Sequence, residues 1–298
     1  MTDTDALNHQ FATINGLRYH YVREGKGPPL LLVHGWPGFY YEWHLTIGPL
    51  AEHFDVVIPD MRGYGETDKP DVPPEEGYTD AVMAADILAL VDHLGWDVAN
   101  IVTHDFGSVW TQRFARTYRD RVGKLVFFQP PYPGIGFRMF APDRVGESWY
   151  VMFHQLPLAE ELVGSSREAT KSYVRHFLSH WSYDKDIWTD EEVERFAEAF
   201  SRPGALRGGF NCYRAAFRTL GQGQGGDPQI HAPTLVLWGE NDSILPVAWS
   251  DKLGDTFTDL TFQTVPECGH WVQREQPALV VREVTKFVLG DDAGSAPK

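Results

Sequence analysis

Short runs of aliphatic, β-branched and aromatic residues recur along the chain, each followed by glycine, proline or aspartate and then by amphipathic helical spacing. This alternation is typical of a mostly parallel sheet flanked by helices. Eight strands are predicted, at residues 11–14, 17–23, 30–34, 55–59, 100–104, 124–128, 233–238 and 261–265. The first two are expected to form an antiparallel hairpin, and the others alternate with helices such as 79–94 and 108–118. The pattern predicts an α/β fold.

The strand pattern is interrupted between positions 129 and 230, where about 100 residues show helical spacing instead. Helices are expected there at 148–162, 167–182 and 190–200. A helical stretch inserted between two strands of one sheet suggests a separate cap over a single core. We therefore predict a core formed by residues 1–131 and 229–298, and a helical cap formed by residues 132–228.

Two patterns in the predicted cap resemble binding motifs only formally. Gly221, Gly223 and Gly226 match G-x-G-x-x-G, but a dinucleotide site needs a strand before the loop and a helix after it. His176 and His180 are four residues apart, yet they lack the glutamate of the zinc motif H-E-x-x-H. We interpret the glycines as a linker and the histidines as packing or surface residues, and we predict neither a metal nor an organic cofactor.

The charge balance narrows the classes of partner. The chain has 26 Lys+Arg against 41 Asp+Glu, a net charge of −15, which repels nucleic acid and anionic membranes. The first ten residues lack a secretory signal, and no apolar run approaches the roughly 20 residues that span a bilayer. Cys212 and Cys268 could form only one disulfide, so we expect reduced, buried thiols. We expect a cytoplasmic monomer or homodimer without nucleic acid or membrane partners.

The first candidate for chemistry is Asp105, which lies between the strand at 100–103 and the helix at 108–118. A tight strand–turn–helix elbow lifts one side chain above the sheet and requires small neighbours, here Thr103 and Gly107. Serine usually occupies this position as the nucleophile. A carboxylate nucleophile needs no deprotonation and suits displacement at a saturated carbon, which leaves an ester on the enzyme. The alternative role for Asp105 is to cap the following helix.

Asp242 and His270 favour the catalytic interpretation. Each follows a predicted strand, and with Asp105 they give the chain order nucleophile, acid, base. His270 is the candidate base, and Asp242 is the candidate acid that orients the imidazole and stabilises its charged form. Glu240, two residues before Asp242, is the alternative acid.

The glycine-flanked loop 34–38, with the sequence HGWPG, follows the third predicted strand. Such a loop can direct a backbone N–H group toward the nucleophile. We predict an oxyanion hole formed by the N–H groups of Trp36 and of Phe106, the residue after the nucleophile.

Taken together, the motifs HGWPG, DMRGYG, HDFG, WGEND and CGHW resemble the α/β-hydrolase superfamily over about residues 10–290. An aspartate nucleophile resembles both the epoxide hydrolases and the haloalkane and haloacetate dehalogenases. Haloalkane dehalogenases typically have tryptophan after the nucleophile, and fluoroacetate dehalogenases have arginine, whereas this chain has Phe106. Many dehalogenases place the acid where this chain has Gln129. The resemblance therefore implies an epoxide hydrolase whose acid is Asp242.

Resemblance to the epoxide hydrolases also implies two cap tyrosines that donate hydrogen bonds to the epoxide oxygen. Tyr213, in the segment NCYR, and Tyr150, seven residues before a proline, match these positions. Trp149 and His154 are alternatives to Tyr150 as the first donor. Aromatic residues near the motifs suggest an apolar substrate pocket; its expected lining is Trp36, Phe106, Trp149, His154 and Trp271.

The predicted function is conversion of an apolar or aryl epoxide to a vicinal diol through a covalent alkyl-aspartate ester. One alternative is a haloalkane or haloacid dehalogenase that uses the same nucleophile. The other is a ligand-binding homologue without turnover, although a pure binder has no need for all three of Asp105, Asp242 and His270.

Overall fold

A computed structural model describes residues 4–219 and 227–290 and contains one eight-stranded sheet. The strand order is β1-β2-β4-β3-β5-β6-β7-β8; β1 and β2 pair antiparallel, as do β2 and β4, and the remaining neighbours are parallel. The strands are β1 (His9–Ile14), β2 (Leu17–Glu24), β3 (Pro29–Val33), β4 (Asp55–Pro59), β5 (Ala99–His104), β6 (Val122–Phe128), β7 (Thr234–Gly239) and β8 (Leu260–Val265). The predicted mostly parallel sheet is confirmed.

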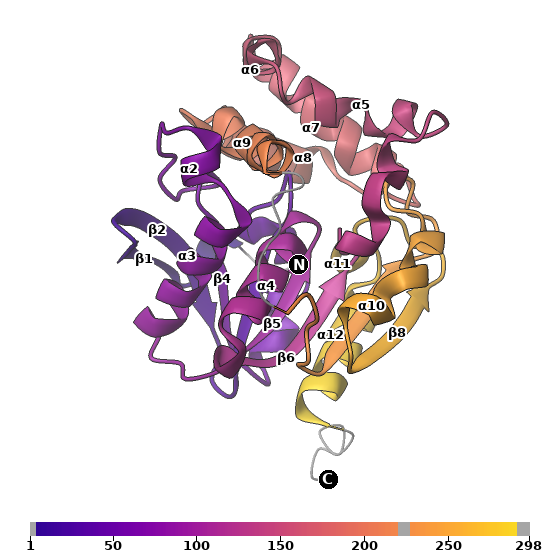
Figure 1. The fold of residues 1–298 in the computed structure, drawn as a ribbon. Coiled ribbons are helices and arrows are strands. Elements are labelled where there is room, and N and C mark those ends of the chain that lie inside the picture. Colours follow the sequence, from indigo (N-terminus) through magenta and orange to yellow (C-terminus); the bar gives the residue numbers. More distant parts are fainter. Residues whose placement is uncertain (1–3, 220–226, 291–298) are drawn as a thin grey trace.

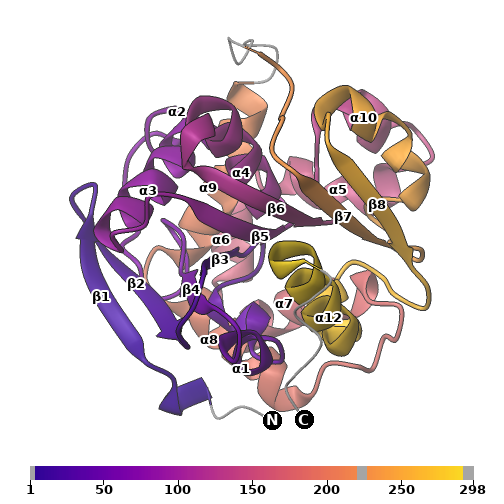
Figure 2. The same ribbon diagram turned by 90° about the horizontal axis from the view of Figure 1, so that it is seen from below.

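Helices cover both faces of the sheet. They are α1 (Ile47–Ala51), α2 (Pro74–Gly77), α3 (Asp80–His93), α4 (Phe106–Thr117), α10 (Leu253–Thr256), α11 (Val272–Glu275) and α12 (Pro277–Leu289). Short 3₁₀ helices are η1 (Thr4–Ala6), η2 (Tyr40–Trp43), η3 (Arg119–Arg121) and η5 (Val247–Lys252). Seen from below, α3 and α4 lie on one face of the sheet, and α1 and α12 lie on the other (Figure 2).

Two cores follow from the alternation of side chains along the strands. In β3, Leu31 and Val33 join the core under α3 and α4, whereas Leu30 and Leu32 join the core under α1 and α12. Successive strand residues point to opposite faces, so a strand covered on both faces is apolar throughout. This explains why the sequence of β3 is a continuous apolar run.

Between β6 and β7 the described chain is helical. We call residues 133–218 the helical insertion; Figure 1 shows its helices above the sheet. It consists of the 3₁₀ helix η4 (Pro133–Phe140), α5 (Val145–Phe153), α6 (Pro157–Val163), α7 (Arg167–Trp181), α8 (Asp190–Ser201) and α9 (Ala205–Arg218). The predicted division into core and cap is compatible with this arrangement and stays a prediction.

The helix predicted at 148–162 is wrong as a single element. The chain forms α5 and α6 instead, and Leu156 between them has extended backbone angles, φ −88° and ψ 136°. Proline disfavours helical geometry in the residue before it but is accommodated in the first turn of a new helix. Pro157 therefore ends one helix and begins the next.

A buried ion pair fixes the helical insertion on the core. Glu192 of α8 is 3% exposed and accepts a 2.7 Å hydrogen bond from Nε of Arg274 in α11. Burial raises the pKa of Glu192, but His44 and Arg274 outweigh burial and lower it to about 2. Glu192 also closes a capping box with Thr189 at the start of α8, so one carboxylate both starts the helix and holds it to the sheet unit.

Gly221, Gly223 and Gly226, the predicted linker, lie outside the described residues. Among the residues that are described, no helix is long and apolar enough to cross a membrane.

Candidate active site

The turn after β5 holds Asp105 in an unusual backbone conformation, with φ 48° and ψ −123°. Its side chain does not cap α4, so the alternative capping role is not observed. The turn fits because its neighbours are glycines: a Cβ at Gly107 would lie 2.6 Å from the His34 carbonyl oxygen, and one at Gly35 would lie 2.4 Å from Cβ of Asp105. The sequence around the elbow therefore allows two backbone segments to approach a single carboxylate.

The Asp105 carboxylate is buried; one of its oxygens accepts a hydrogen bond, and the other lies near His270. Its Oδ1 accepts a 2.9 Å hydrogen bond from the Trp36 N–H group, and its Oδ2 lies 3.7 Å from Nε2 of His270. Burial raises the pKa of Asp105, but His270 and the Trp36 N–H group together lower it below its usual value. Asp105 is therefore ionised at neutral pH, as a carboxylate nucleophile requires.

His270 links Asp105 to Asp242. Its Nδ1 lies 2.7 Å from Oδ2 of Asp242, whose Oδ1 accepts 2.9 Å bonds from the N–H groups of Ile244 and Leu245. Burial lowers the pKa of His270, but Asp242 and Asp105 outweigh burial and raise it to about 10. In the resting state the imidazole is therefore protonated between two carboxylates.

The alternative acid, Glu240, is turned away from this pair. It is exposed and accepts a 2.7 Å hydrogen bond from the Thr264 hydroxyl group. Of the two candidates, the structure brings Asp242 to His270.

A buried polar network beneath His270 was missed by the sequence analysis. Nε2 of His104 lies 2.9 Å from the His270 carbonyl oxygen, and Nδ1 of His104 lies 2.8 Å from Oε1 of Glu42. Gln273 donates a 2.8 Å bond to the same Glu42 oxygen. Only the position of His104, directly before Asp105, hinted at this network, because Glu42 and Gln273 are 231 residues apart in sequence.

Tyr150 of α5 and Tyr213 of α9 face Asp105 across a cavity of about 250 Å³. Both tyrosines are buried, and their ring centroids are 5.6 Å apart. Burial and the nearby negative charge of Asp105 raise the pKa of both phenols well above 10. The two hydroxyl groups are therefore protonated at neutral pH and able to donate hydrogen bonds.

The rest of this cavity is mainly apolar. Its remaining lining residues are Phe106, Val109, Pro131, Tyr132, Ile135, Gly136, Met139, Phe140, Val151, Ala216, Phe217, Ile244 and Leu245. The Tyr132 hydroxyl donates to the Trp249 carbonyl group and is already engaged. Among the described lining residues, Asp105 is the one that carries a charge.

Most of the predicted pocket residues do not line this cavity. Phe106 does, whereas Trp149 is 38% exposed, packs on Phe177 of α7 and is not among the residues that line this cavity. Trp36 stacks on the ring of Tyr150 and is not among the residues that line the cavity. The facing direction of an aromatic side chain depends on tertiary packing, which nearness to a motif in sequence does not give.

The other two predicted pocket residues, His154 and Trp271, lie outside the lining of this cavity as well. His154 is buried, and its Nε2 lies 2.7 Å from the Tyr173 hydroxyl oxygen, so it is engaged away from the cavity. Trp271 is buried against Trp181 and Trp188. Neither lines the cavity, because both serve as packing beneath its walls.

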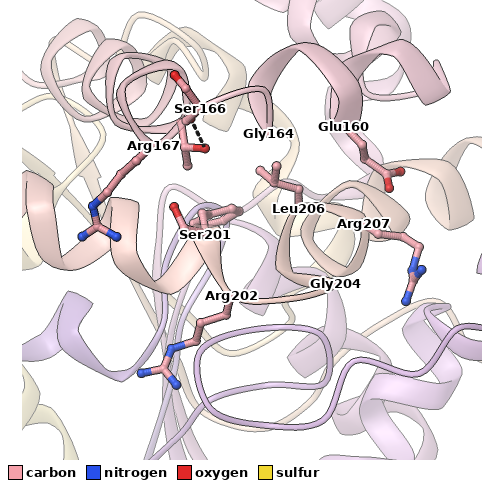
Figure 3. A pocket seen from close by; sticks show the side chains of 11 residues that line it. Glu160, Gly164, Ser166, Arg167, Ser201, Arg202, Gly204, Leu206 and Arg207 are labelled. Atoms are coloured by element: carbon pink, nitrogen blue, oxygen red, sulfur yellow. Dashed lines mark hydrogen bonds between the residues drawn. The ribbon is translucent and has the colours of Figure 1, made fainter.

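A second cavity, of about 430 Å³, lies within the helical insertion and shares no lining residue with the first (Figure 3). Three arginines line it, and each is paired with a carboxylate: Arg167 with Glu194, Arg202 with Glu66, and Arg207 with Asp71. Because their charges are already compensated and Asp105 lies elsewhere, this cavity is not the reaction site.

Comparison with known proteins places this geometry in a family. Residues 28–277 match the model of the alpha/beta hydrolase fold. The chain is 30% identical to the soluble epoxide hydrolase of Corynebacterium sp. (strain C12), over 95% of this chain and 98% of that protein. The chain belongs to the α/β-hydrolase family, in its epoxide hydrolase branch.

Further similarities agree with this assignment to the epoxide hydrolase branch. The chain is 31% identical to epoxide hydrolase 4 of Homo sapiens, over 97% of this chain and 81% of that protein. The solved structure of the epoxide hydrolase CorEH without ligand superposes with a TM-score of 0.83 at 31% identity, covering 94% of this chain and 98% of that chain. The predicted fold and family are confirmed, and the predicted enzyme class, a hydrolase of ether bonds, agrees with these relatives.

Proposed function

We propose that this protein hydrolyses a small, uncharged epoxide to a vicinal diol through an ester with Asp105. The observation that carries the proposal is the arrangement around the 250 Å³ cavity: an ionised carboxylate faces two protonated phenols across apolar walls. A nucleophile on one side and hydrogen-bond donors on the other are what opening of a strained ether requires.

In the first step, Asp105 attacks an epoxide carbon while Tyr150 and Tyr213 donate hydrogen bonds to the oxygen. The carbon–oxygen bond of the ring breaks, and the oxygen takes a proton from one of the two phenols as the ester forms. The raised pKa of each phenol keeps its proton available until negative charge develops on the substrate. The apolar lining excludes water until then.

The second step depends on a change at His270. Forming the ester removes the negative charge of Asp105, which is one of the two carboxylates that raise the pKa of His270. The imidazolium can then return a proton to the phenolate left by the first step, and the neutral imidazole acts as a base toward water. Hydroxide adds to the ester carbonyl carbon of Asp105, and the N–H groups of Trp36 and Phe106 stabilise the resulting anion. Breakage of the ester bond releases the diol.

The cavity limits the substrate. Ligand cavities usually measure roughly 300–1,000 Å³, so a volume of about 250 Å³ favours a compact molecule with a single ring or a short chain. A second charge on the substrate would be buried without a partner among the described lining residues. We therefore propose an apolar alkyl or aryl epoxide, acted on without a metal or an organic cofactor. The cytoplasmic location and the monomeric or homodimeric state stay predictions.

The test is to trap the ester in the His270→Gln variant and measure the intact protein mass. After mixing with styrene oxide, we expect a mass gain equal to that of the intact epoxide. The gain should be absent when Asp105→Ala is combined with His270→Gln. Parallel samples with 1-bromobutane and chloroacetate test the dehalogenase alternative, since a gain of an alkyl or carboxymethyl group alone would replace our proposal. Absence of any adduct, together with no turnover of an epoxide panel by the wild type, would favour the ligand-binding alternative.

A further inference from the structure

The loop that carries Asp242 is held by hydrogen bonds on two sides. Within the loop, the peptide N–H groups of Ile244 and Leu245 donate to Oδ1 of Asp242 at 2.9 Å each. Below it, the indole N–H of Trp238 donates to the Leu245 carbonyl group at 2.8 Å. The carbonyl groups of Ser243 and Ile244 take no part in the proposed mechanism.

Arg144 of the helical insertion donates to both of these carbonyl groups. Its Nη2 donates to the carbonyl oxygen of Ser243, and the distance to that of Ile244 is 3.2 Å. The guanidinium group also lies 5.4 Å from the ring centroid of Trp249. Arg144 itself is half-buried and immediately precedes α5.

The two bonds to Arg144 and the two bonds to Asp242 involve the same two peptide groups. The peptide between Ser243 and Ile244 accepts from Arg144 at its oxygen and donates to Asp242 at its nitrogen, and the peptide between Ile244 and Leu245 does the same. A cation at the carbonyl end polarises a peptide group and strengthens its N–H as a donor. Arg144 is therefore connected to the Asp242 carboxylate through two parallel peptide groups.

We propose that Arg144 is a positioning residue for ester hydrolysis, acting on Asp242 through the peptide groups of the loop. It fixes the loop so that Oδ2 of Asp242 stays directed at His270, and its positive charge offsets part of the carboxylate charge. The inference rests on the proposed function. It concerns the second step, in which His270 acts as base, rather than the attack by Asp105.

Replacing Arg144 should therefore slow ester hydrolysis without slowing ester formation. Replacing Arg144 leaves Asp105, Tyr150 and Tyr213 in place, so ester formation should be preserved. Loss of the positive charge leaves more negative charge on Asp242, which favours the protonated form of His270 and weakens it as a base. The other ionisable groups near this pair are unchanged in the variant: Asp105 and His104 beside His270, and Tyr150, Cys268 and Glu275 near Asp242.

The experiment compares Arg144→Met with Arg138→Met, a matched control. Arg138 belongs to the same segment and its guanidinium lies 5.8 Å from the same Trp249 ring, but it pairs with Asp251 and bonds the carbonyl groups of Gly134 and Ile135 rather than those of Ser243 and Ile244. By rapid quench and intact mass with styrene oxide, we expect Arg144→Met to form the ester within about twofold of the wild-type rate. Its ester should decay about tenfold more slowly, and the acidic limb of the decay rate should move to higher pH.

Arg138→Met should match the wild type in both steps, and Arg144→Lys, which keeps a charged donor, should recover part of the decay rate. Equal slowing of both steps, or an unshifted pH limb in Arg144→Met, would overturn the proposal. A second measurement does not need turnover: the low-field proton resonance of His270 Nδ1–H should shift in Arg144→Met but not in Arg138→Met. If the resonance is unchanged, the positioning role is wrong even where the proposed function holds; if it shifts while no epoxide reacts, only the proposed function fails.

Discussion

The carboxyl edge of the sheet and the helical insertion contribute opposite sides of the same cavity, but they hold their residues by different means. At the sheet edge, Asp105 and Asp242 lie in the loops after β5 and β7, where backbone N–H groups bond their carboxylates: that of Trp36, in the loop after β3, and those of the Asp242 loop itself. In the insertion, Tyr150 and Tyr213 are held by aromatic neighbours such as Trp36. Backbone turns define a position narrowly, whereas packed rings can be rearranged by changing their neighbours.

This difference suggests a division of tasks. The sheet edge sets which atoms react, and the insertion sets the shape of the cavity and the hydrogen bonds to the leaving oxygen. Variants on the two sides should therefore fail in different ways, and the following predictions test that distinction.

The largest effect is expected at the sheet edge. Asp242→Asn keeps the shape of the side chain but cannot stabilise the imidazolium form of His270 or fix its tautomer, so kcat should fall by about 10³–10⁴-fold. Steady-state hydrolysis of styrene oxide measures the loss. Glu240→Gln, two residues away and exposed, serves as the control and should keep wild-type kcat. A loss in Glu240→Gln as large as that in Asp242→Asn would mean that the acid has been misassigned.

A smaller effect is expected when one tyrosine of the insertion is replaced, because two phenols donate hydrogen bonds to the same epoxide oxygen. Tyr150→Phe and Tyr213→Phe should each lower kcat/KM by about 10²-fold, and the double variant should lose more than either. Ester formation, followed by mass after rapid quench, should slow, while ester decay stays near the wild-type rate. Tyr173→Phe is the control, since its hydroxyl group bonds His154 and does not line the cavity. A change in ester decay alone would contradict the division between the two regions.

The smallest effect is expected on the pH dependence of thermal stability, where a variant at the sheet edge should again differ from one in the insertion. The folded-state pKa of His270 is about 10, above the ordinary value of 6.5, so its contribution to the free energy of unfolding is fully present below pH 6.5 and is lost as pH rises through 10. Between pH 7 and 10 the Tm of the wild type should fall by several degrees more than that of His270→Gln. Tyr213→Phe should keep the wild-type slope, because the phenol stays protonated throughout this window. If the Tm of the wild type and that of His270→Gln fall equally between pH 7 and 10, His270 is not positively charged in the folded protein at neutral pH.

The residues at the sheet edge could be predicted from the sequence more readily than those of the insertion. Asp105, Asp242 and His270 each follow a strand, so local signals were enough to locate them and the sheet around them. Trp149 does not line the cavity that contains Asp105, because its direction depends on which face of α5 packs on the core. Arg144 escaped notice because it meets the Asp242 loop from about 100 residues away in sequence.

Helix α9 was not among the predicted helices, and its glycines explain why. Gly208 and Gly209 are poor helix formers, so helical spacing around Tyr213 is weak in the sequence. In the structure, a Cβ at Gly208 would lie 2.4 Å from the Gly63 carbonyl oxygen, so the glycine allows α9 to pack directly on a core loop. Tertiary contact here outweighs helix propensity, and that contact is not visible in one sequence.

The backbone at Asp105 has a consequence for how this protein can change over time. A residue other than glycine with φ 48° and ψ −123° carries a conformational cost of about 1–3 kcal/mol. Glycine would adopt these angles without that cost, but Asp105→Gly would also leave the buried Trp36 N–H group and His270 without their carboxylate partner. The strain at Asp105 is therefore offset by the partners of its carboxylate, and directed evolution that selected for heat resistance alone should not favour glycine at this position.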